Sequence, residues 1–124
     1  MKIICKKESI HKNRPDGLEI NYYLRDEYEI HYNEQHPNTT QVWHYHEKIF
    51  ETIFIIQGEL TAKWKEKNKI IEKIVQAGDL IEVENTPHSF VNHTNQIVKF
   101  LVIKQVLSGE NKRELFKTDK IIDE

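Results

Sequence analysis

Two histidines and a glutamate stand close together in the segment WHYHEKIFETIFIIQG, residues 43–58. Side chains two positions apart on a β-strand point to the same face, so His44 and His46 share one face. A short loop at 47–50 then turns the chain, and Glu51 opens an alternating apolar strand. The pattern predicts a β-hairpin in which two imidazoles and one carboxylate converge on one point.

Such a group has the chemistry of a metal site. Divalent first-row ions prefer neutral imidazole nitrogen and carboxylate oxygen at roughly 2.0–2.2 Å. A single carboxylate leaves residual positive charge on the site, which makes the bound ion a Lewis acid. Open coordination positions could then accept water, dioxygen or a substrate oxygen.

A fourth histidine, His88, begins another strand-like segment, HSFVN at 88–92. A turn at Gly78 closes the strand before it, and a loop at 84–87 delivers His88 to the new strand. We expect His88 to be a fourth metal ligand. Asn92 shares its face and has two open roles: a hydrogen bond to a ligand histidine, or a cap at the end of the strand.

These residues make the sequence similar to the cupin superfamily, whose two motifs are G(X)5HXH(X)3–4E(X)6G and G(X)5PXG(X)2H(X)3N. The first motif is matched by His44, His46, Glu51 and Gly58. Asn38 stands where that motif begins with glycine, and asparagine tolerates the left-handed backbone conformation that glycine supplies there.

The second motif is matched by Gly78, His88 and Asn92. Glu84 and Thr86 replace its proline and second glycine, and His88 comes one residue early. The resemblance implies one divalent transition metal ion, with Fe, Mn, Ni, Zn and Cu all compatible with these ligands. The ligands that it implies are His44, His46, Glu51 and His88.

Length and pattern predict one all-β domain. A chain of 124 residues can bury one core but hardly two, and its short strands are regularly separated by turns. The resemblance implies a small double-stranded β-helix, a jelly-roll barrel, with the metal inside and a pocket at the open end. We expect residues 1–124 to form this single domain, with the motif-bearing barrel at 38–107 and a tail at 108–124.

The tail has a short helical pattern at 110–116. We expect it to be helical or extended and to fold over a barrel edge or against a partner subunit. Opening strands are predicted at 18–24 and 28–32, and the apolar run at 97–107 predicts a strand that is buried on both faces.

Other conspicuous residues have simpler interpretations. His11, His31 and His36 lack a partner at ligand spacing, so we expect them at the surface or in loops. Lys63 and Lys65 alternate with Trp64 and predict a solvated strand face opposite the indole.

Composition excludes several partners. The net charge of −2 does not suggest nucleic acid or an anionic membrane as a partner, and no apolar run reaches the roughly 20 residues of a membrane span. The amino terminus lacks a signal-like stretch, so we expect a cytoplasmic protein. The one cysteine, Cys5, cannot form an internal disulfide.

The tyrosine-rich strands at 18–24 and 28–32 would leave open sheet edges. We expect a homodimer in which a second copy of the chain covers these edges.

The resemblance implies a small-molecule substrate or ligand. The leading hypothesis is a metal-dependent enzyme of the dioxygenase, isomerase or decarboxylase type that acts on a keto acid, hydroxy acid or sugar-like compound. The alternative is a non-catalytic metal-dependent domain that binds or senses a small molecule. The sequence identifies no general base. A catalytically silent barrel is disfavoured because a buried Glu51 among histidines is costly without a metal.

Overall fold

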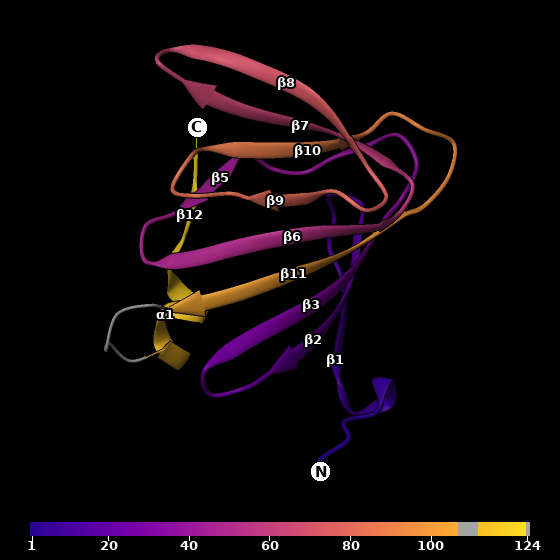
Figure 1. Ribbon diagram of the computed structural model, residues 1–124, viewed down its shortest axis with the longest axis vertical. Helices are drawn as coiled ribbons and strands as arrows, with labels where there is room; N and C mark the ends of the chain where they lie inside the picture. The colour runs from indigo at the N-terminus through magenta and orange to yellow at the C-terminus, as the bar shows by residue number, and fades with distance from the viewer. Residues whose placement is uncertain (107–111, 124) are drawn as a thin grey trace.

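Two antiparallel sheets face each other in the computed structural model, which describes residues 1–106 and 112–123 (Figure 1). Sheet A contains, in spatial order, β1 (Ile10–Asn13), β2 (Leu18–Leu24), β3 (Tyr28–Gln35), β11 (Val98–Val106), β6 (Ile49–Gln57) and β9 (Leu80–Glu82). Sheet B contains β12 (Lys120–Ile122), β5 (His44–His46), β10 (His88–Asn92), β7 (Glu59–Glu66) and β8 (Lys69–Gln76), with β4 (Thr39–Thr40) paired to β10. These two sheets confirm the predicted all-β jelly-roll class.

The core lies between the sheets because alternate side chains on each strand point inward. Its buried members include Leu18, Ile20, Ile53, Ile55, Leu60, Val98, Phe100 and Val102. Along β11, inward Phe100 and Val102 are buried, whereas outward Leu101 and Ile103 are only half-buried. The prediction that this strand is buried on both faces was therefore wrong, since an antiparallel sheet can turn one face to solvent.

Two turns flank the segment that carries His44, His46 and Glu51, and both use unusual backbone conformations. Asn38 has a φ of 55°, so it does take the left-handed conformation expected of it. Gly58 has a φ of +91°, and a Cβ there would stand 3.0 Å from Cγ2 of Val98. A side chain at 58 would thus be strained and crowded at the end of β6.

The end of the chain completes one sheet. Helix α1 (Lys112–Thr118) includes the described part of the predicted 110–116 pattern, and residues 107–111 lie outside the described part. Strand β12 then pairs with β5, so that Lys120 is opposite His46 and Ile122 is opposite His44. The tail folds over the barrel edge as predicted, at the strand that carries two of the expected ligands. The only helices in the described ranges, α1 and the short 3-10 turn at Lys6–Glu8, are too short to span a membrane.

Candidate metal centre

The predicted hairpin does not form, because the chain crosses from sheet B to sheet A between β5 and β6 and these two strands pair with other neighbours. The two sheets face each other, however, and this still brings the three polar side chains together. Strand β5 points His44 and His46 inward, where they are 6 % and 1 % exposed, while Tyr45 is half-buried on the other face. The turn is shorter than predicted, because β6 begins at Ile49. Glu51 is 5 % exposed on the inward face of β6, and ligand atoms of the two histidines and Glu51 all lie within 4.8 Å of one another.

The structure also brings His88 to this group. In sheet B, His88 on β10 lies opposite His44 on β5, and the two ring centroids are 4.4 Å apart. The Nε2 atom of His88 lies 3.8 Å from Oε1 of Glu51. His88 thus adds a fourth possible ligand from β10, a strand that is distant in sequence from β5 and β6.

Backbone carbonyls set the tautomers of two imidazoles. Nδ1 of His44 lies 2.8 Å from the carbonyl oxygen of Val42, and Nδ1 of His88 lies 2.8 Å from that of Thr86. A carbonyl oxygen can only accept, so each Nδ1–H donates the hydrogen bond. In the neutral ring Nε2 then carries the lone pair, which is the arrangement that a metal-binding histidine needs.

Some nitrogen atoms that could bind a metal make no hydrogen bond within the described part of the chain. Among the described residues, Nε2 of His88 and both ring nitrogens of His46 are buried without a hydrogen bond. Nε2 of His46 lies 3.1 Å from Oε2 of Glu51, but not in hydrogen-bonding geometry. Unpaired buried polar atoms cost about 1–3 kcal/mol each, so a cation that uses these lone pairs fits the site.

Burial and neighbouring charges keep His44, His88 and Glu51 in the protonation states that bind a metal. Burial, followed by the neighbouring His88, lowers the pKa of His44 to about 3. Burial also lowers the pKa of His88. Burial alone would raise the pKa of Glu51, but contact with His46 and the ammonium of Lys104 together bring it below its ordinary value. His44 and His88 are therefore neutral and Glu51 is a carboxylate near neutral pH.

Lys104 is a residue of this centre that the sequence reasoning missed. It lies opposite Glu51 in the register of β11 and β6, and its Nζ atom is 3.7 Å from Oε2 of Glu51. The signal was available, because Lys104 shares the two-residue spacing of the inward Phe100 and Val102 on the same strand.

His31 corrects another prediction. We expected it at the surface, but it is 7 % exposed and its Nε2 lies 2.8 Å from Oε1 of Glu29. Nη2 of Arg113, on α1, donates to Oε2 of Glu29 at 2.8 Å. The reason is the register of β3, which turns a polar set inward: Glu29, His31, Asn33 and Gln35.

Asn92 is fully buried, and its hydrogen bonds favour the second of its two expected roles. Its Nδ2 donates to the carbonyl oxygens of Gln35 (3.1 Å), His36 (3.1 Å) and Gln96 (2.8 Å). Its Oδ1 accepts from the backbone N–H of Thr94 at 2.9 Å. These contacts hold the end of β10 and the turn that follows it, and none of them joins Asn92 to a predicted ligand histidine.

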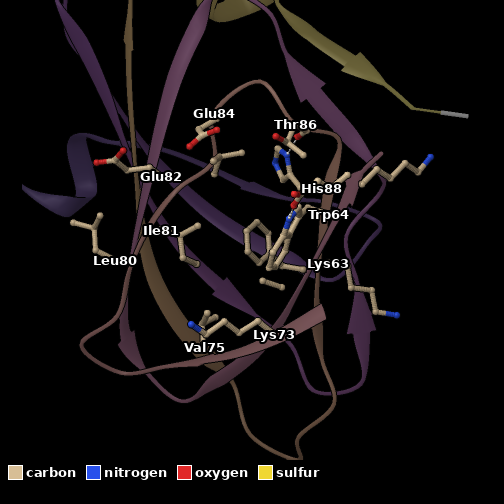
Figure 2. A pocket seen from close by; sticks show the side chains of 15 residues that line it. Lys63, Trp64, Lys73, Val75, Leu80, Ile81, Glu82, Glu84, Thr86 and His88 are labelled. Atoms are coloured by element: carbon tan, nitrogen blue, oxygen red, sulfur yellow. Dashed lines mark hydrogen bonds between the residues drawn. The ribbon is translucent and has the colours of Figure 1, made fainter. Parts of the chain in front are cut away.

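A cavity of about 570 Å³ adjoins the centre. It lies between the β7–β8 hairpin and the segment from Leu80 to Thr86, and His88 is part of its lining. Figure 2 shows the side chains of Trp64 and His88 next to each other in this cavity. One of the four predicted ligands therefore faces a space large enough for a small molecule.

A two-sheet barrel that encloses a buried group of two histidines and a glutamate defines the class of protein: a small β-barrel with a candidate metal centre. A family model described as "Cupin domain" matches residues 31–104, well over half of the chain. The chain therefore belongs to the cupin family, as its motifs indicated.

Solved structures agree with this fold. Oxalate decarboxylase of Bacillus subtilis superposes with a TM-score of 0.75 at 15 % identity, over 97 % of this chain and 32 % of that one. A cupin-superfamily sugar phosphate isomerase from Silicibacter pomeroyi gives 0.64 at 20 % identity, over 78 % and 69 %. Drosophila melanogaster CENP-C, in a structure bound to CAL1, gives 0.73 at 17 %, over 83 % and 85 %.

These identities are low enough that the likeness concerns the fold alone. The chain spans about a third of the length of oxalate decarboxylase. A search of curated proteins found no match.

Proposed function

We propose that this cupin binds one divalent transition metal ion and acts as a metal-dependent enzyme on a small oxygenated metabolite. The ligands are His44, His46, Glu51 and His88. The observation that carries the proposal is the convergence of these buried side chains, in which Nε2 of His46 and of His88 have no other partner among the described residues. When bound, the ion would supply a Lewis acid and, if redox-active, dioxygen chemistry.

The chain's own residues prepare that chemistry. Hydrogen bonds from Nδ1 to backbone carbonyls orient His44 and His88. Lys104 lies beside Glu51 and stabilises its carboxylate charge. The cavity next to His88 can hold the metabolite against the ion and exclude bulk water.

The reaction type proposed is that of a dioxygenase, isomerase or decarboxylase, with a keto acid, hydroxy acid or sugar-like compound as substrate. Similar folds serve an oxalate decarboxylase and a sugar phosphate isomerase, which supports small oxygenated compounds as the substrate class. Fold likeness is an analogy here, since one fold can host many functions.

The second candidate is a non-catalytic domain that binds or senses a small molecule through the same metal. One observation favours it: the charged side chains Glu29 and Lys104, near the centre, already have polar partners. Glu29 contacts His31 and Arg113, and Lys104 contacts Glu51. To act as a general base, either side chain would first have to lose its present contact.

Metal analysis of protein purified without added metal tests the shared part of both candidates. We expect about one equivalent of a transition metal in the wild type and almost none in the double variant His44→Ala/His46→Ala. The matched control is His11→Ala/His36→Ala, since these two histidines have side chains 45 % exposed and should not affect the metal. Full occupancy in the first double variant, with its fold verified by circular dichroism, would overturn the metal centre.

Turnover assays separate the two candidates. Oxygen uptake and product formation are measured with 2-oxo acids, hydroxy acids and sugar phosphates on protein loaded with iron, manganese or zinc. An enzyme should show turnover that Glu51→Gln reduces together with metal retention. Recovery of a bound metabolite unchanged, with every metal inactive, would replace the enzyme by the binding domain.

A further inference from the structure

One row of inward-facing residues crosses sheet B and links the metal centre to the cavity. His44 on β5 lies opposite His88 on β10, His88 lies opposite Trp64 on β7, and Trp64 lies opposite Ile71 on β8. Directly opposed residues in an antiparallel sheet share a face and have neighbouring side chains. Trp64 is therefore the next side chain beyond two of the predicted ligands.

Trp64 shares the lining of the cavity with several other apolar side chains. The cavity lining includes the apolar residues Ala62, Trp64, Val75, Ile81, Val83 and Phe90. The indole is half-buried, and its Nε1–H donates to Oε2 of Glu66 at 3.2 Å. Because that hydrogen bond already satisfies the polar atom of Trp64, the ring can offer its apolar surface to a ligand.

Charge does not select the ligand at this end of the cavity. Charged residues of both signs line it in equal number: Lys63, Lys65 and Lys73 against Glu66, Glu82 and Glu84. Figure 2 shows Lys63 and Glu82 on opposite sides of the space occupied by Trp64 and Ile81. Selectivity here must come from shape and apolar contact, rather than from a net charge.

Volume sets the size of the ligand. About 570 Å³ lies within the range of roughly 300–1,000 Å³ typical of pockets for ring-bearing small molecules. A two- or three-carbon acid would leave most of this space, including the region beside Trp64, to water.

We propose that Trp64 is the specificity-determining residue of a subsite for an aromatic ring, which takes ligands whose adjacent oxygen atoms bind at the metal centre. The ring would lie against the indole, with Phe90 and Ile81 nearby, while the oxygen-bearing end of the same molecule reaches the side of His88. This inference rests on the proposed metal centre and narrows its substrate class to aromatic hydroxy or oxo acids and related oxygen chelators.

Two α-hydroxy acids with the same chelating end test the subsite. Mandelate carries a phenyl ring where lactate carries a methyl group. Cobalt(II)-loaded protein is titrated with each acid, and the dissociation constants come from the visible spectrum of the cobalt. We expect mandelate to bind about tenfold more tightly than lactate, as aromatic contact with an indole would give.

Substitutions then assign the preference to one indole. In Trp64→Leu the ratio of the two constants should fall to about two or less, while lactate affinity and cobalt content stay at wild-type values. Trp43→Leu is the matched control, because Trp43 is the other tryptophan of the chain and lies outside the cavity lining. It should retain the full ratio.

The outcomes separate this inference from the proposed function. If cobalt binds but mandelate binds no more tightly than lactate, or if Trp64→Leu keeps the ratio, the subsite is overturned and the metal centre stands. Failure to bind cobalt overturns the metal centre itself. If Trp64→Leu does not fold, tryptophan fluorescence provides the test. Mandelate should change the emission of Trp43→Phe, in which Trp64 is the remaining indole. It should leave the emission of Trp64→Phe unchanged. Any other result overturns the subsite.

Discussion

Asp119 accepts a hydrogen bond from the backbone N–H of Ile49 at 2.9 Å, across 70 positions of sequence. The same oxygen, Oδ2, also accepts from the backbone N–H groups of Glu47 at 3.1 Å and Lys48 at 2.8 Å. These three groups lie in or next to the turn between β5 and β6, where the chain crosses from sheet B to sheet A. A carboxylate from the end of the chain thus fixes the turn that separates His46 from Glu51.

Replacement of Asp119 by alanine should therefore affect both the fold and the centre. Three buried or half-buried N–H groups would lose their acceptor, which we expect to lower the free energy of unfolding by about 1–3 kcal/mol. Metal affinity should fall as well, because the turn that positions His46 relative to Glu51 would be less well ordered. Urea unfolding and a competitive metal titration measure the two effects.

A neighbouring acidic residue is the control for Asp119. Asp123 forms an ion pair with Lys65 at the surface, and such pairs contribute about 0–1 kcal/mol. Asp123→Ala should therefore change stability little and leave metal affinity unaltered. Equal effects at the two positions would contradict the role given to the turn.

Lys104→Met should strengthen metal binding. The ammonium lies 3.7 Å from Oε2 of Glu51 and would repel a cation held by that carboxylate. We expect the affinity for zinc to rise about tenfold, while the metal-free protein loses stability because Glu51 loses its nearest positive charge. Lys104→Arg keeps the charge and should stay near the wild type. Weaker zinc binding in Lys104→Met would contradict this account.

His31 should make stability depend on pH. Burial, its largest influence, lowers the pKa of His31, although the hydrogen bond with Glu29 opposes that change. His31 of the unfolded chain then binds a proton near pH 6.5, whereas His31 of the folded protein stays neutral at that pH. The free energy of unfolding therefore falls as pH decreases from about 6.5. The charged groups around it are Glu29, Lys104 and Glu51.

His31→Gln isolates that contribution. The variant cannot take up the proton in either state, so its stability should decline less between pH 7 and pH 5 than that of the wild type. Urea unfolding of metal-free protein at several pH values gives both slopes. A steeper slope in the variant would contradict the lowered pKa.

The homodimer remains a proposal, and the outer face of sheet A is the surface that we assign to it. Phe54 on β6 lies opposite Leu80 on β9 and Leu101 on β11, and all three belong to the outward face. Phe54 is 39 % exposed and Leu80 is 60 % exposed, so apolar side chains adjoin each other at this surface. A second copy of the chain would cover them by two-fold pairing.

Light scattering at micromolar concentration should give twice the monomer mass. Phe54→Glu combined with Leu101→Glu should reduce it to the monomer mass, because charges would be buried in the contact. Ile70→Glu is the control, since Ile70 is 60 % exposed on β8, away from this surface. A monomeric wild type would rule out the dimer.

Local sequence was enough to predict the common face of His44 and His46 and several strands, but the predicted pairing of the strands that carry His46 and Glu51 was wrong, because they belong to different sheets. The two-residue period of a strand places His44 and His46 on one face whatever the rest of the chain does. The predicted strand at 18–24 has the bounds of β2, and the segment HSFVN is β10. Asn38 takes the left-handed conformation for a local steric reason as well.

Tertiary structure decided which distant residues meet. The position of His88 beside His44, and that of Lys104 beside Glu51, depends on which strands are neighbours in each sheet and on their register. The inward turn of His31 was predicted wrongly because a lone histidine carries no sign of the face that its strand will bury.

The Asp119 contact has the same origin: a carboxylate shows no preference in sequence for a turn 70 positions away until β12 pairs with β5. Alternation along a strand is a property of the local backbone, so it can be read directly from sequence. Strand order and register are set by the packing of the whole core, and they supplied the rest of the site.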